Sequence, residues 1–268
     1  MAIEIELLHS PEVPLEVENL RPDLFEAKSL MEIQKELIFH GKQQCQVGDF
    51  FRVSGNPADQ VHRWKGDFSK VHWIGAKMEA GEIWIEGQCG RHLGSEMSGG
   101  QITVSGDCSD WVGAEMQGGL IRVGGNAGHL VGSAYRGSPI GMIGGSILIE
   151  GKAGNEVGHT MRRGLIAVGS AGDLAGFNML AGTLLIFGDA GIRHGAGMRR
   201  GTIGFFGPNA PTLLPTFRYA CRQQLSVLTV LQQQLTDNGY PMKIPGTVDL
   251  YHGDFLEGGR GEILISAT

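Results

Sequence analysis

The chain has little of what would assign it to several common protein classes. It contains 4 cysteines among 268 residues, too few and too scattered for a disulfide scaffold, which fits a reducing cytoplasm. No run of about 18 apolar residues occurs, so we expect no membrane span. The acidic start lacks a basic n-region and an apolar h-region, so we expect no secretory signal. Basic residues number 22 against 28 acidic ones, and the resulting net charge of −6 argues against nucleic acid as a partner.

Aromatic residues are scarce at 7%, whereas glycine reaches 44 residues, more than twice its usual share. All but nine glycines lie between Gly66 and Gly207, and they mark an internal repeat. Seven units can be aligned, of 18 or 19 residues apart from the longer first and fourth. Each unit follows the pattern G-x-x-G-x-x-x-G, then Met, another Gly and an I-x-[IV] run. The fourth unit holds an insertion at Ser133–Gly141.

The repeat predicts one strand in each unit. Apolar residues alternate in pairs such as Ile102/Val104 and Ile121/Val123, which is typical of a strand with one buried face. No unit has room for an ordinary helix beside that strand, and the Leu and Asn offsets of leucine-rich repeats are absent. We therefore expect an all-β fold, a right-handed parallel β-helix (β-solenoid) of about seven 18–19-residue coils.

Small mixed α/β caps are expected at both ends, because a stacked core needs its ends covered. Residues 1–65 form the predicted N-terminal capping segment, with a capping-box pattern at Ser29 and Glu32. Residues 66–207 form the glycine-rich β-helix. Residues 208–268 form the C-terminal capping segment, with one helix that ends near Gly239 and a last strand near its end.

Repeat offsets test the residues that could carry chemistry, because equal offsets stack on neighbouring coils. Cys89 and Cys108 share an offset with alanines, which favours a column of small buried side chains over a thiol pair or metal site. The repeat histidines fall at four different offsets, which does not support a stacked metal site. They are His92, His129, His159 and His194. The sequence thus predicts no metal-binding or cofactor-binding residues.

The methionines share one column, which predicts a packed ladder inside the rod rather than a path for a soft metal. They are Met78, Met97, Met116, Met142, Met161, Met179 and Met198. Glu96 and Glu115 share another offset, with Lys77 one coil earlier, where it could neutralise one of them. A paired carboxylate could serve a glycan-active enzyme. A solvated ladder is the simpler interpretation, and we predict no catalytic residues.

Two features favour contacts with other proteins. Arg162 with Arg163 and Arg199 with Arg200 occupy matching offsets two coils apart and form a basic strip. This strip is either a solvated edge or a docking surface for an acidic partner or polyanionic ligand. The insertion must leave the rod as a loop, and it carries interface-favoured residue types and Pro139. The candidate subunit contacts are Tyr135, Arg136, Arg162, Arg163, Arg199 and Arg200.

The repeat resembles the glycine-rich β-helix domain of the large glutamate synthase subunit. It is more similar still to the C subunits of formylmethanofuran dehydrogenase and of the bacterial formyltransferase/hydrolase complex. The resemblance covers almost the whole chain. Beside the repeats it is carried by residues 11–25 (PEVPLEVENLRPDLF), 40–51 (HGKQQCQVGDFF), 133–142 (SAYRGSPIGM), 213–221 (LLPTFRYAC) and 259–264 (GRGEIL).

The resemblance implies a role in one-carbon metabolism, within a complex that oxidises formaldehyde. That complex moves a formyl group from formyl-tetrahydromethanopterin to a methanofuran-type carrier and hydrolyses it to formate. Metal-dependent hydrolysis is attributed to the A subunit and formyl transfer to the D subunit, so the C subunit is expected to be a scaffold without cofactors of its own. Its partners would be subunits A, B and D in the cytoplasm, with neither nucleic acid nor membrane. The alternatives are the C subunit of a tungsten or molybdenum formylmethanofuran dehydrogenase and a glycan-active β-helix enzyme.

Overall fold

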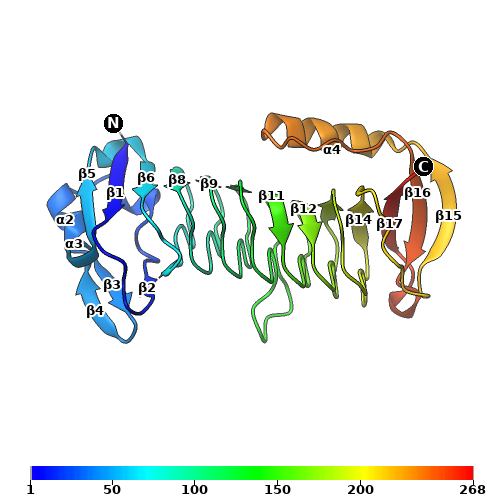
Figure 1. Ribbon diagram of the computed structural model, residues 1–268, viewed down its shortest axis with the longest axis horizontal. Coiled ribbons are helices and arrows are strands. Elements are labelled where there is room, and N and C mark those ends of the chain that lie inside the picture. The colour runs from blue at the N-terminus through cyan, green and yellow to red at the C-terminus, as the bar shows by residue number, and fades with distance from the viewer. Residues whose placement is uncertain (1, 268) are drawn as a thin grey trace.

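A computed structural model describes residues 2–267 of the chain, which form an elongated rod with helices near both ends (Figure 1). The N-terminal elements are β1 (Ile3–Leu7), β2 (Leu15–Glu16), α1 (Pro22–Phe25), α2 (Leu30–Gln34), β3 (Leu37–His40), β4 (Gln43–Gln46), α3 (Val47–Phe50), β5 (Phe51–Ser54), the 3-10 helix η1 (Pro57–Asp59), β6 (Val61–Lys65) and β7 (Val71–His72). The repeats contribute β8 (Glu82–Glu86), β9 (Gln101–Val104), β10 (Leu120–Val123), β11 (Ser146–Ala153), β12 (Leu165–Ala171), β13 (Thr183–Ile186) and β14 (Gly201–Phe205). The C-terminal elements are β15 (Arg218–Gln223), α4 (Ser226–Asp237), β16 (Val248–Gly253), the 3-10 helix η2 (Phe255–Glu257) and β17 (Gly261–Ser266).

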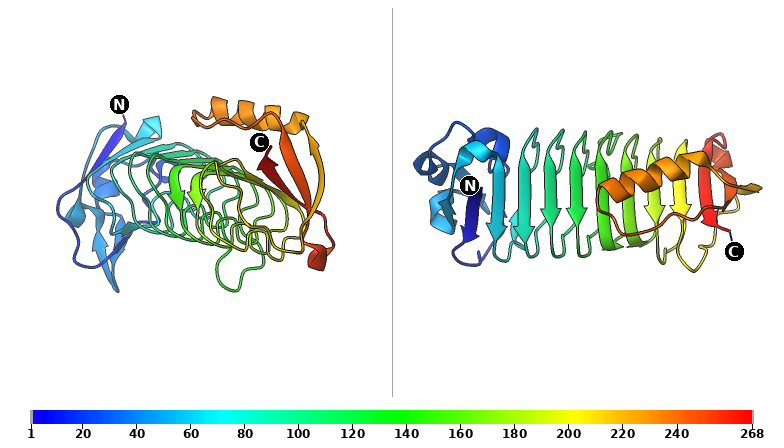
Figure 2. Two further views of the ribbon diagram at one scale, coloured as in Figure 1. Left: turned by 45° about the vertical axis from the view of Figure 1, so that its right-hand side comes forward. Right: turned by 90° about the horizontal axis from the view of Figure 1, so that it is seen from above.

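One long sheet runs the whole length of the rod. Its 13 strands follow the order β15-β16-β17-β14-β13-β12-β11-β10-β9-β8-β6-β1-β5. Neighbours from β1 to β17 pair in parallel, whereas β5, β15 and β16 pair antiparallel at the two ends. A second sheet of four strands, β4-β3-β2-β7, belongs to the N-terminal end. Seen from above in Figure 2, the repeat strands lie side by side like rungs.

The expected all-β, right-handed parallel β-helix is wrong as a description of this fold. The structure is a large, mostly parallel sheet with a second small sheet and the helices α1 to α4. Each repeat supplies a single long-sheet strand, and its remaining residues are mainly turns linked to the next repeat by isolated bridges such as Cys89–Cys108. Further continuous sheets along the repeats do not form, because residues with positive φ and glycines interrupt extended backbone there.

The expected boundaries at residues 65 and 207 stay predictions. Hydrogen-bonded pairing continues across both, since β1 pairs with β6 and β8 follows β6, while β14 pairs with β17. The predicted capping box is confirmed: the Ser29 hydroxyl accepts the Glu32 N–H, and the Glu32 carboxylate accepts the Ser29 N–H at 2.8 Å. The predicted C-terminal helix is also confirmed as α4. None of the helices in residues 2–267 is long and apolar enough to cross a membrane.

The methionine column fills the space between repeats, and its predicted burial is confirmed. All seven methionines of the column are fully buried. A Cβ added to Gly119 would lie 2.8 Å from Met97 Cε, and one added to Gly164 would lie 2.7 Å from Met142 Cε. Each methionine therefore occupies the volume that a side chain at this glycine of the following repeat would need, which couples the two motif positions.

Polar side chains connect the turns of successive repeats. The Asp110 carboxylate accepts the His129 N–H at 2.8 Å, and His129 Nδ1 accepts the Asn155 N–H at 2.9 Å. The Asn155 side chain accepts the Asp173 N–H at 3.0 Å, and Asp173 accepts the Ile192 N–H at 3.0 Å. These bonds satisfy backbone donors that no strand pairing serves.

Helix α4 covers only the C-terminal part of the outer sheet face (Figure 2). There, outward-facing Leu148, Ala167 and Leu185 are buried against Leu235 and Tyr240. Such strands are buried on both faces and lose the alternation seen in the earlier repeats. The Tyr240 hydroxyl donates to the Ile149 carbonyl at 2.9 Å and anchors the segment after the helix.

We expect Gly145→Ala to destabilise the fold strongly. Gly145 has φ +85°, and an added Cβ would lie 2.7 Å from Gly119 O and 2.8 Å from Met116 Cε. Gly137→Ala is the matched control, since Gly137 has φ +92° but no atom within 4 Å of the added Cβ. The shared backbone penalty is about 1–2 kcal/mol, and overpacking should cost Gly145→Ala about 1–3 kcal/mol more. Equal free energies of unfolding for the two variants in denaturant titrations would contradict the stacking argument.

We expect acid to destabilise the N-terminal end through His62. This ring is fully buried against Phe25, neither nitrogen has a hydrogen-bond partner among the described residues, and burial lowers its pKa to about 3. Between pH 6.5 and 3 the unfolded chain binds the proton more readily. Stability should therefore fall with falling pH by up to about 1.4 kcal/mol per unit. Denaturant titrations across this range should give a shallower pH slope for His62→Phe, and identical slopes would refute the assignment.

Candidate subunit-contact sites

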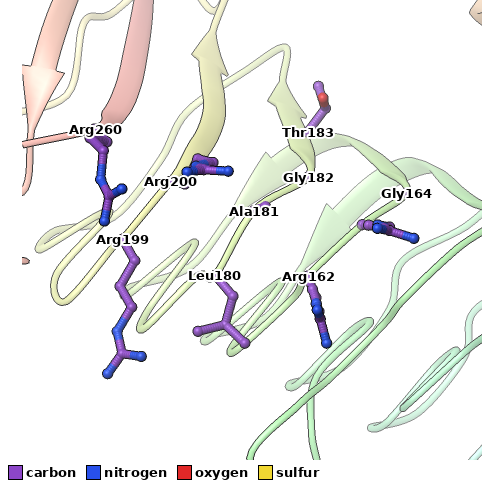
Figure 3. Close-up of a pocket in the computed structure, with 10 residues that line it drawn as sticks. Arg162, Gly164, Leu180, Ala181, Gly182, Thr183, Arg199, Arg200 and Arg260 are labelled. Carbon is purple, nitrogen blue, oxygen red and sulfur yellow. The ribbon is translucent and has the colours of Figure 1, made fainter.

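An open groove lined by five arginines lies near the C-terminal end of the rod (Figure 3). Its volume is about 560 Å³, and Leu180, Ala181, Gly182, Thr183 and Gly164 complete its lining. The arginines are Arg162, Arg163, Arg199, Arg200 and Arg260. We call this feature the arginine groove.

Strand register explains why these arginines come together. Leu165, Thr183, Thr202 and Glu262 are aligned across β12, β13, β14 and β17. The residues two positions earlier form one row, Arg163, Ala181, Arg200 and Arg260. The residues three positions earlier give a second row, Arg162, Leu180 and Arg199. The predicted basic strip is thus one surface, extended by an arginine from the C-terminal segment.

The groove is strongly cationic and accessible. All five arginine side chains are exposed, and no acidic residue lines the groove. Arg199 Nε lies 3.3 Å from Glu257 Oε2 of η2. Within residues 2–267, the other four arginines have no ion pair with an acidic side chain. Their guanidinium groups are therefore available to an external anion.

The insertion loop is anchored by an aromatic stack on the rod. Trp73, His92 and Trp111 occupy one column, and all three have positive φ values near +65°. The Trp73 and His92 rings are stacked with centroids 4.1 Å apart. Tyr135 of the loop stacks on Trp111 at 4.9 Å, and its hydroxyl lies 3.0 Å from His92 Nδ1. We call this set the aromatic stack.

Proton positions in the stack follow from burial. Burial lowers the pKa of His92 to about 4 and raises the pKa of Tyr135 well above its ordinary value. At neutral pH the phenol therefore keeps its proton and donates to the neutral imidazole. The Tyr135 N–H also donates to Glu115 Oε1 at 2.9 Å. One loop residue is thus held by ring packing and two hydrogen bonds.

The rest of the loop leaves the rod, as Figure 1 shows for the green segment below the repeats. Arg136 and Gly137 are exposed at its tip, while Tyr135 is half-buried. A pocket of about 320 Å³ lies beside it, lined by Trp111, Tyr135, Arg136, Glu156 and His159 among others. The structure thus separates the two loop candidates: Tyr135 fastens the loop, and Arg136 is presented to solvent.

The remaining sequence candidates have structural partners. Cys89 and Cys108 are buried neighbours with Sγ atoms 3.0 Å apart, and burial raises the pKa of Cys108. Lys77 pairs with Glu18 at 2.6 Å, so the expected neutralisation of a repeat carboxylate by Lys77 is not what the structure shows. In the part of the chain described, no group of three or more His, Cys, Asp or Glu side chains could hold a metal ion.

Two parts of these sites escaped the sequence reasoning. Arg260 lies outside the repeats, so only the pairing of β17 with β14 places it in the groove. The aromatic stack did have a signal, because Trp73, His92 and Trp111 each precede a repeat glycine by two residues. Attention to histidines alone missed the mixed aromatic column.

Residues 67–216 match the GXGXG motif family, and this is more than half of the chain. The chain therefore belongs to the GXGXG motif family, whose members share this glycine-rich repeat.

Among individual proteins, the chain is similar to the C subunits of formylmethanofuran dehydrogenases, which confirms the resemblance seen in the sequence. It is 44% identical over 87 residues to the C subunit of the tungsten-containing formylmethanofuran dehydrogenase 2 of Methanothermobacter thermautotrophicus. It is 41% identical over 86 residues to the C subunit of the molybdenum-containing formylmethanofuran dehydrogenase 1 of Methanosarcina barkeri. Each match covers 31% of this chain and 32% or 29% of the relative, so the chain spans about a third of these curated relatives.

A solved structure matches the chain from end to end. It is a chain in the crystal structure of the formyltransferase/hydrolase complex (FhcABCD) from Methylorubrum extorquens in complex with methylofuran. The TM-score is 0.90 at 31% sequence identity, with 99% of this chain and 100% of that chain covered.

We expect Tyr135→Ala to release the insertion loop. The variant loses the stack on Trp111 and leaves His92 Nδ1 without its donor, which should cost about 2 kcal/mol. Tyr135→Phe keeps the ring and should cost about 1 kcal/mol. Limited trypsin digestion reports the loop directly, because Arg136 is a cleavage site. Cleavage after Arg136 should be fastest in Tyr135→Ala, and equal rates in both variants and the parent would contradict the anchoring role.

Proposed function

We propose that the chain is a non-catalytic scaffold subunit of a formyltransferase/hydrolase complex. In this proposal, the complex transfers a formyl group from formyl-tetrahydromethanopterin to a methanofuran-type carrier and then hydrolyses it to formate. The end-to-end match to a chain of the formyltransferase/hydrolase complex carries the proposal, because similarity over 99% of the chain at 31% identity extends far beyond the repeat.

A scaffold role is supported by what the candidate catalytic residues do. Glu115 holds the Tyr135 backbone N–H, and Lys77 is engaged by Glu18. An acid/base pair needs carboxylates free to reach a substrate in a shared pocket. Glu96 lies on the neighbouring repeat but lines none of the described pockets. These residues fit a structural use better than a catalytic one.

The proposal assigns the chemistry to the partner subunits. The crystallised complex from Methylorubrum extorquens holds methylofuran, and here a carrier of that kind, tetrahydromethanopterin and a hydrolytic metal would belong to subunits A, B and D. The exposed Arg136 and the arginine groove are the proposed contacts with those subunits. The four cysteines are unpaired, which fits a cytoplasmic location.

A second candidate is the C subunit of a formylmethanofuran dehydrogenase. Identities of 41 to 45% over 83 to 87 residues favour it, although they cover 31% of the chain. Tungsten or molybdenum and iron–sulfur clusters in the purified assembly would distinguish this oxidoreductase from the hydrolase complex.

We expect a tagged native chain to co-purify with three further subunits and with formyl-transfer and hydrolase activity, but without tungsten, molybdenum or iron–sulfur clusters. The isolated chain should not turn over formyl carrier, because it presents no free acid/base pair. Recovery of the chain alone would contradict the proposed assembly. Turnover by the isolated chain that disappears in Glu96→Gln would contradict the scaffold role.

A further inference from the structure

The arginine groove runs against the overall charge of the protein. The chain carries a net charge of −6, yet five exposed arginines meet around a groove that no acidic residue lines. Arg200 and Arg260 lie on adjacent strands, and like charges in that position repel each other. Such a cluster lowers stability unless a ligand compensates it, so its presence points to a bound anion.

The two rows match the dimensions of an extended chain. Arg163 and Arg260 are three strand spacings apart, about 14 Å, which four or five extended residues would span. In Figure 3, Leu180 lies between Arg162 and Arg199, and all three side chains point the same way. An apolar residue between two cations suits a segment in which carboxylates alternate with uncharged side chains.

Carboxylates fit these cations particularly well. The planar guanidinium fork binds a carboxylate through two parallel N–H donors. The protein itself provides an example at the edge of the groove, where Arg199 Nε meets Glu257 Oε2 at 3.3 Å. Glu257 is on the short helix η2, so it occupies one arginine and leaves the others free.

We propose that the arginine groove binds an extended acidic segment of a partner subunit, through Asp or Glu carboxylates that pair with Arg163, Arg200 and Arg260. This inference rests on the proposed function, since the segment belongs to another subunit of the same assembly. It assigns the groove a specific ligand chemistry and adds Arg260, which lies outside the repeat.

The direct test measures binding of a fluorescein-labelled octapeptide of alternating Glu and Ser to the full chain by fluorescence anisotropy at low salt. The same peptide with Gln for Glu is the ligand control. The groove variant Arg163→Gln/Arg200→Gln/Arg260→Gln should bind at least about tenfold more weakly, because it loses three charge-assisted contacts. The control Arg52→Gln/Arg63→Gln/Arg218→Gln removes the same charge from exposed sites elsewhere and should change affinity less than about twofold.

Two further variants test the carboxylate geometry. Arg163→Lys/Arg200→Lys/Arg260→Lys keeps the charge but not the fork, and should weaken binding about threefold. Glu257→Gln should tighten binding about twofold by freeing Arg199. Thermal unfolding of every variant checks that the fold is retained, which the exposure of these side chains leads us to expect.

Absence of binding by the parent chain, or equal losses in the groove and control variants, would overturn the proposal. Tighter binding of a single-stranded oligonucleotide than of the acidic peptide would overturn it too, by assigning the groove to nucleic acid. In the assembly, the groove variant should recover less of at least one partner than the control variant. If the parent chain recovers its partners but does not bind the peptide, the groove inference fails while the proposed function stands.

Discussion

The stacking of repeats at the spacing of parallel strands is the constraint on which the rest of the structure depends. Neighbouring backbones approach so closely that an added Cβ on Gly106 would lie 2.6 Å from Gly87 O, and one on Gly119 would lie 2.7 Å from Gly100 O. Glycine is therefore required where one repeat passes over the carbonyl of the last. The methionines are the counterpart of this rule, because each fills the volume that a glycine of the next repeat leaves empty.

A chain built in this way has little freedom inside each repeat, so variation is confined to outward-facing positions. The aromatic stack, the asparagine and aspartate bonds between turns, and the arginine rows all use such positions. None of them disturbs the buried column. The same rigid frame can therefore carry quite different surfaces along its length.

Those surfaces divide the rod into two parts with different properties. Its earlier repeats carry the aromatic stack and leave an outer sheet face with Thr103 and Arg122 half-exposed. The later repeats are covered by α4 on that face and carry the arginine groove on another. This arrangement suits a protein that holds several partners at set distances, which is what a scaffold within a larger assembly must do.

The sequence by itself determined the repeat, the strand in each unit, the buried methionine and cysteine columns, the capping box and helix α4, because each depends on spacing along the chain. Four of the five groove arginines were also predicted, since equal offsets place them on one surface. The expectation of an all-β β-helix failed because offsets do not show whether turn residues will pair into further sheets. Only the tertiary structure brought Arg260 beside Arg200, through pairing between β14 and β17 across a segment of more than fifty residues. It alone also folded Tyr135 back onto Trp111, because a contact between an inserted loop and an earlier repeat has no periodicity that a sequence could reveal.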